Sequence, residues 1–183
     1  MCEIHKTVCQ SVFLILLAVA PFLEGCATDA HPQNMVPVSF NLLTRHSKTV
    51  SLVIGGGRPT HAMTGADIPN AVFQSALAEA IMKSKVFAQV SDDSSADYIL
   101  KVTIDTSARQ PSGFDLKDTM TATWEIRSRQ SNIAVWKDLI TTDFTATMHD
   151  SALGGKRFRM AREGAARENI KTGIQEISTL KLE

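Results

Sequence analysis

Residues 120–127 read MTATWEIR, and the apolar side chains of this stretch fall on every second position. The apolar positions are Met120, Ala122, Trp124 and Ile126. Such alternation is typical of a strand in an antiparallel sheet, with one face packed on a core and the other in water. The stretch therefore predicts a half-buried β-strand, and the rest of the fold can be worked out on either side of it.

The same period of two recurs before and after this stretch. It is present over residues 98–104, and again in a longer segment whose apolar side contains Trp136, Ile140, Phe144, Ala146 and Met148. An earlier strand is predicted over Thr49–Ile54, where it runs into Gly55-Gly56-Gly57. These segments predict about four strands.

Two other segments have helical spacing. Apolar residues recur every three or four positions over 72–81, where Asp67 is predicted to cap the helix and Pro69 to lie in its first turn. A longer helix is predicted over 155–180, with charged residues such as Arg162 mostly on its solvated faces. The order β-α-β-β-β-α predicts an α+β fold, in which an antiparallel sheet of about four strands carries two helices on one face.

The beginning of the chain has a different character. Residues 12–23 form an apolar run after a polar stretch that contains Lys6, and the sequence then continues as Leu23-Glu24-Gly25-Cys26. The run is shorter than the roughly 20 residues that a membrane-spanning helix needs. A basic residue, a short apolar core and a small residue before the cut predict a secretory signal peptide. We expect a signal peptide over 1–25, a flexible tether over 26–40 and a single α+β domain over 41–183.

The charge balance and the cysteines exclude several classes of function. The sequence carries 19 basic and 19 acidic residues, and loss of Lys6, Glu3 and Glu24 with the signal peptide would leave 18 and 17. Nucleic-acid-binding proteins normally have a strong basic excess, so no nucleic-acid partner is expected. Cys2 and Cys9 lie in the predicted signal peptide, so only Cys26 would remain and no disulfide or zinc site is expected.

Three local patterns suggest chemistry, and each has a simpler interpretation. Gly55-Gly56-Gly57 follows a strand, but no Lys-Ser/Thr pair follows it, as a phosphate-binding loop requires, so a strand-ending loop is expected. His149-Asp150-Ser151 contains the residue types of a hydrolase triad, but a turn with Asp150 or Ser151 as a helix cap is expected. Asp92-Asp93-Ser94-Ser95 lacks the ligand spacing of a calcium loop. We expect no catalytic residue, no metal site and no cofactor.

The strongest candidate for partner binding is the loop between the second and third strands. It contains Gln110, Pro111, Gly113, Phe114, Asp115 and Leu116. Large apolar side chains in a loop either fold back on the core or face a partner. Folding back is the favoured interpretation here, and partner binding is the alternative.

These residues together resemble the small lipoproteins of bacteria. Leu23-Glu24-Gly25-Cys26 is similar to their lipobox, and the other resembling features are the three glycines, QPSGFDL at 110–116 and GKRFRMAREGAARENI at 155–170. The order of elements is also similar to that of auxiliary lipoproteins of lipid-transport systems and of the lipopolysaccharide-assembly lipoprotein.

The resemblance implies a location and a class of partner. It implies that Cys26 is acylated and becomes the first residue of the processed chain, with the domain in the periplasm. Ala27 after the cysteine implies anchoring in the outer membrane. The expected function is a non-enzymatic binding or assembly module for an envelope protein or glycolipid. The rival interpretation is an envelope enzyme that assembles its site from dispersed residues such as Asp115, Glu163 and Arg167.

Overall fold

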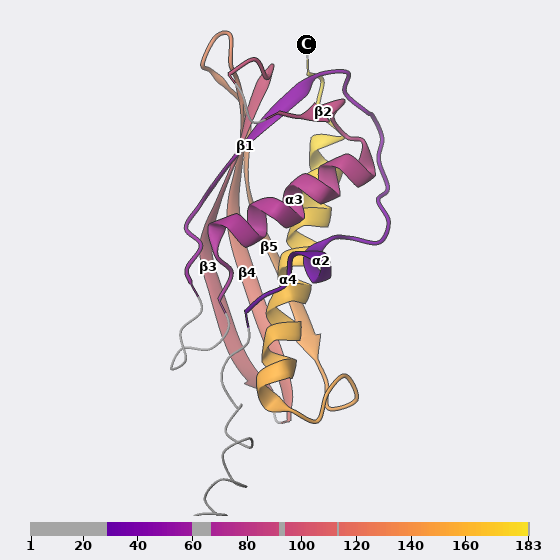
Figure 1. The fold of residues 1–183 in the computed structure, drawn as a ribbon, viewed down its shortest axis with the longest axis vertical. Coiled ribbons are helices and arrows are strands. Elements are labelled where there is room, and N and C mark those ends of the chain that lie inside the picture. Colours follow the sequence, from indigo (N-terminus) through magenta and orange to yellow (C-terminus); the bar gives the residue numbers. More distant parts are fainter. Residues whose placement is uncertain (1–28, 60–66, 92–93, 113, 183) are drawn as a thin grey trace, which may run out of the picture.

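A computed structural model describes residues 29–59, 67–91, 94–112 and 114–182. The order of elements is α2 (Pro32–Met35), β1 (Thr49–Gly55), α3 (Asn70–Ser84), β2 (Gln89–Val90), β3 (Tyr98–Ser112), β4 (Asp115–Ser128), β5 (Ala134–Ala146) and α4 (Gly154–Ile177). The strands form one sheet in the order β2-β1-β3-β4-β5. Helices α3 and α4 cover one face of this sheet, as predicted (Figure 1).

The sheet is mixed, with five strands, so the prediction of an antiparallel sheet of about four strands is wrong in these two respects. β1 runs parallel to both β2 and β3, whereas β3, β4 and β5 are antiparallel. The reason is the crossover, because a helix that follows a strand carries the chain back along the sheet, and the next strand then runs in the same direction. β2 has two residues, too few to produce a detectable alternation.

The alternation in β4 is confirmed. Met120, Ala122, Trp124 and Ile126 all lie in the core and are at most 1% exposed. In β3 the pairing with β4 shifts between Ile104 and Thr106, which marks a β-bulge. Met148 was predicted on the buried side of the last strand, but β5 ends at Ala146 and Met148 is 45% exposed.

Close contact between α4 and the sheet depends on glycine. A Cβ atom at Gly173 would lie 2.6 Å from Cη2 of Trp124, and one at Gly164 would overlap the ring of Phe144. Next to this contact, Trp124 Nε1 donates a hydrogen bond to Asn169 Oδ1 at 2.9 Å, and Asn169 Nδ2 donates to the Ile140 carbonyl at 2.9 Å. The helix therefore lies directly on the indole ring, and the buried polar atoms of this contact are satisfied.

The segment before β1 is packed over part of the range predicted as a tether. Ala30 and Met35 are 4% and 0% exposed. The backbone N–H of His31 donates to Glu163 Oε1 at 2.7 Å, and Asn34 Nδ2 donates to Glu163 Oε2 at 2.8 Å. Glu163 thus fixes α2 to α4, a contact between residues about 130 positions apart that local composition does not predict.

Gly173→Ala should destabilise the fold by about 1–3 kcal/mol, although alanine is the better helix former, because the new methyl group overpacks Trp124. Gly155→Ala is the matched control, since a Cβ there meets nothing within 4 Å; it should leave stability unchanged or raise it by up to about 1 kcal/mol. Urea unfolding of both variants measures the difference. Equal effects of the two substitutions would contradict the contact.

Candidate functional site

A cleft of about 630 Å³ lies where β1 ends beside the β-bulge of β3. Its lining comes from five stretches of the chain: Gly56, Gly57, Arg58, Asp67, Ile68, Ile104, Asp105, Thr106, Ser107, Ala108, Met120 and Arg162. The lining contains both apolar side chains, such as Ile104 and Met120, and charged ones, such as Asp67 and Arg162.

Two of the three glycines, Gly56 and Gly57, line the cleft. Gly56 has φ +78°, in the left-handed region, and a Cβ there would overlap the Ile104 carbonyl. The backbone N–H of Gly57 donates to Asn70 Oδ1 at 2.7 Å. β1 ends at Gly55, so the prediction of a strand-ending loop is confirmed. The glycines are needed for close approach to β3 and to the start of α3.

Arg162, which lines the cleft with Asp67, pairs with two aspartates. Its Nη1 lies 2.8 Å from Asp67 Oδ1, and its Nε lies 3.1 Å from Asp118 Oδ2. Ser107 Oγ donates to the other oxygen of Asp118 at 2.8 Å. The guanidinium also stacks over the Phe158 ring, 5.7 Å from its centre. One buried cation therefore ties α4 to β4 and to the segment before α3.

Two predictions about these residues are wrong. Arg162 was expected on a solvated face, yet it is 5% exposed. Asp67 was expected to cap α3, but the residue at the cap position is Pro69 and no side chain bonds the helix start there. A signal for the ion pair was present in the sequence. Asp118 lies two residues before Met120, so in a strand its side chain is on the same face as those of Met120 and Trp124. A charged residue in phase with a buried face indicates a buried partner.

Of the three residues named for the rival enzyme site, only Glu163 and Arg167 lie near each other, where both contact Asn34. Glu163 holds α2 through His31 and Asn34. Arg167 Nη1 donates to the Asn34 carbonyl at 3.2 Å. Asp115 lies at the start of β4, where its Oδ1 accepts from the Met148 N–H at 3.3 Å. Glu163 and Arg167 therefore both serve the docking of α2, and Asp115 serves a different contact.

The segment after β5 is a turn, as predicted. Asp150 Oδ2 accepts hydrogen bonds from the backbone N–H and the hydroxyl of Thr147, and the N–H bond is the main reason that the pKa of Asp150 is lowered. Asp150 thus closes the turn. The residue at the cap position of α4 is Leu153, so neither Asp150 nor Ser151 is the helix cap that was predicted. No group of three or more metal-ligating side chains occurs among the described residues.

The predicted partner-binding loop is mostly strand. Gln110 and Pro111 belong to β3, whereas Asp115 and Leu116 belong to β4, and Gly113 lies outside the described residues. Phe114 is 80% exposed. The favoured interpretation, in which the apolar side chains fold back on the core, is therefore wrong for Phe114. Leu116 is half-buried beside Ala146 of β5.

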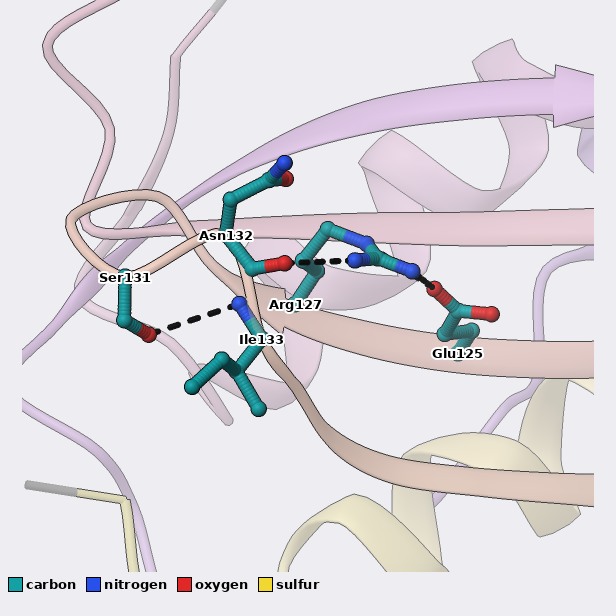
Figure 2. A network of polar contacts seen from close by, with 5 residues as sticks. All are labelled: Glu125, Arg127, Ser131, Asn132 and Ile133. Carbon is teal, nitrogen blue, oxygen red and sulfur yellow. Dashed lines mark hydrogen bonds and ion pairs between the residues drawn. The ribbon is translucent and has the colours of Figure 1, made fainter.

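A compact polar network closes the opposite end of the sheet, in the turn between β4 and β5 (Figure 2). Arg127 donates to Glu125 Oε1 through Nη2 at 2.6 Å and to the Asn132 carbonyl through Nη1 at 2.5 Å. Asn132 has φ +55°, which asparagine tolerates better than most residues. Ile133 in this turn is 63% exposed.

The long edge strand β5 carries charges along its free side. Asp138 Oδ1 accepts a hydrogen bond from the backbone N–H of Leu139 at 2.7 Å. Such charged groups protect an edge from pairing with another chain. Asp138 also lies near Glu176 of α4, whose pKa is raised by burial first and then by its hydrogen bond and repulsion with Asp138.

Comparison with known proteins shows the fold. No model of a protein family matches the chain, and no curated protein sequence matches it. A Xanthomonas campestris protein assigned to the family DUF330 is similar in structure, with TM-score 0.56 and 16% identity over 84% of this chain and 100% of that one. A minor lipoprotein of Acinetobacter baumannii is similar with TM-score 0.51 and 20% identity, over 72% of this chain and 93% of that one.

A third structure agrees with these two. A candidate lipoprotein from Caulobacter crescentus has TM-score 0.50 and 14% identity, over 71% of this chain and 88% of that one. The chain has the fold of small bacterial lipoproteins. That agrees with the resemblance in its sequence. The similarity to lipid-transport lipoproteins stays a prediction. Cys26 lies outside the described residues, and within them no helix combines the length and apolarity needed to cross a membrane.

Arg162→Met should destabilise the protein by about 3–5 kcal/mol, because Asp118 would remain buried without its cation. Adding Asp118→Leu to this variant should recover much of the loss. Lys171→Met is the control, since Lys171 pairs with Glu168 at 3.9 Å on the surface and should contribute less than about 1 kcal/mol. Urea unfolding compares the variants. Equal losses of unfolding free energy for Arg162→Met and Lys171→Met would show that the buried ion pair contributes no more to stability than a surface pair.

Glu176→Gln should stabilise the protein at pH 7 and have little effect at pH 3. The raised pKa means that the folded chain binds this proton more tightly than the unfolded chain, so stability falls as the pH rises above the ordinary value of 4.5. Asp97→Asn is a control of opposite sign, because hydrogen bonds from Thr49 lower the pKa of Asp97 and stabilise its charged form. Thermal melts at the two pH values test both signs.

Proposed function

We propose that this chain is an envelope lipoprotein, anchored to a membrane by acylated Cys26, that acts as a non-enzymatic binding or assembly module. The observation that carries the proposal is the sequence at 12–26, a short apolar run followed by Gly25 and Cys26. The fold supports it, since structures of lipoproteins from two bacteria share this architecture.

The geometry of the cleft favours binding over chemistry. Arg162, Asp67 and Asp118 are occupied with one another, and the Ser107 hydroxyl donates to Asp118. A serine becomes a nucleophile when a neighbouring base removes its proton, and the neighbour here already balances the charge of an arginine. These groups therefore hold three elements together, and the cleft above them offers a mixed polar and apolar surface.

The finer location belongs to the same proposal. We place the anchor in the outer membrane, because Ala27 follows Cys26, and the domain in the periplasm. The partner is an envelope protein or a glycolipid. Both classes combine apolar and polar groups, as the lining of the cleft does.

Cys26→Ser should abolish incorporation of a palmitate analogue in cells and release the domain from the membrane fraction. Cys9→Ser is the matched control, because Cys9 lies in the predicted signal peptide and its loss should leave labelling of the processed chain unchanged. Gel fluorescence of the labelled protein and fractionation of the envelope provide the two measurements. Labelling that persists in Cys26→Ser would overturn the proposal.

A further inference from the structure

Three exposed apolar side chains lie at the end of the molecule where α4 begins. Phe114 is 80% exposed between β3 and β4, and Met148 and Leu153 are 45% and 70% exposed between β5 and α4. The hydrogen bond from the Met148 N–H to Asp115 brings these two turns together. Figure 1 shows both turns at the same end of the sheet. We call Phe114, Met148 and Leu153 the apolar end.

The turn that carries two of these side chains is held in place. Arg157 Nη1 donates to the carbonyls of Ser151 and Ala152 at 2.7 and 3.1 Å, and Asp150 closes the turn through Thr147. Large apolar side chains fixed in water are unfavourable, and a cluster of them marks a surface that contacts something.

The length of chain before the described domain indicates what that contact is. The hydrogen bond from His31 to Glu163 fixes residue 31 beside α4. Cys26 precedes His31 by five residues, and five residues span at most about 18 Å. Gly154, at the beginning of α4, is nine residues from Glu163 and so about 14 Å along the helix axis. Ile177, at the other end of α4, is about 21 Å from Glu163 on the same scale.

A lipid on Cys26 can therefore reach the level of the apolar end but not the opposite end of α4. We propose that the apolar end rests on the phospholipid surface that holds the anchor, with Phe114, Met148 and Leu153 in the interfacial region. This inference rests on the proposed acylation of Cys26. Exposed Lys156 beside them would remain among the lipid headgroups. An acyl chain combined with a second membrane contact anchors a protein more firmly than one chain alone.

The orientation that follows is specific. α4 points away from the membrane, and the turn between β4 and β5 with Ile133 lies farthest from it (Figure 1). Ile133 is apolar and 63% exposed, so it provides a control that matches Phe114 and Leu153 in character but not in position.

Single thiols can test this orientation, because the processed chain has no cysteine besides Cys26. The full chain carrying Phe114→Cys, Leu153→Cys or Ile133→Cys would be purified, labelled with an environment-sensitive dye and placed in phosphatidylethanolamine–phosphatidylglycerol vesicles. The dye at 114 and 153 should shift its emission to the blue and be quenched by spin-labelled lipid, whereas the dye at 133 should do neither. Aqueous emission without quenching at 114 and 153 would overturn the inference.

A second form of the protein distinguishes failure of the membrane contact from failure of the proposed acylation. In it, residues 1–26 are replaced by a hexahistidine segment that binds nickel-chelating lipid in the same vesicles, so the domain is tethered without acylation. The blue shift at 114 and 153 should persist there. Absent palmitate labelling of Cys26 would reject the lipoprotein proposal, whereas an absent blue shift in both forms would reject the membrane contact alone.

Discussion

The contact between the Trp124 ring and the backbone of α4 is the constraint on which the rest of the structure depends. The ring lies against Gly173, where a methyl group would already be too close, and its N–H is bonded to Asn169 of the same helix. Asn169 in turn bonds the Ile140 carbonyl. One aromatic side chain thereby sets the height of α4 above β4, while its hydrogen-bonded neighbour sets the position of the helix over β5.

With α4 fixed at this height, its charged residues cannot all face water. Arg162 falls between the helix and the sheet, where burial of a lone cation would be strongly unfavourable. Asp118 and Asp67 compensate its charge from two different elements. Glu163, on the neighbouring position, accepts two hydrogen bonds from α2. Through Arg162 and Glu163, α4 is therefore bonded to β4, to the segment before α3 and to α2.

The docking of α2 has a consequence for the proposed anchoring at Cys26. A flexible tether lets a domain adopt any orientation, whereas a segment that packs from residue 30 onward leaves only a short connection to Cys26. The ion pairs and hydrogen bonds of α4 then act on the orientation of the whole domain. In the proposed anchored form, the position of Glu163 along α4 would set which end of the sheet lies closest to the lipid.

The periodicity of the sequence by itself determined approximately where β1, β3, β4, β5, α3 and α4 lie and, for β4, which face is buried. It did so because an alternation of two or a spacing of three to four is a local property of consecutive residues. The short apolar run at 12–23 predicts the signal peptide, and the resemblance of residues 23–26 to a lipobox implies the acylated cysteine.

Only the tertiary structure decided the direction of β1, the presence of β2, the pairing of Arg162 and the exposure of Phe114. Arg162 lies 44 residues from Asp118 and 95 from Asp67, so their meeting depends on the path of the α3 crossover and on the height of α4. Phe114 is exposed because the β3–β4 hairpin extends to Ser112 and Asp115, which leaves its side chain in the turn beyond the core. Contacts between distant segments follow from how whole elements pack, and no window of neighbouring residues contains that information.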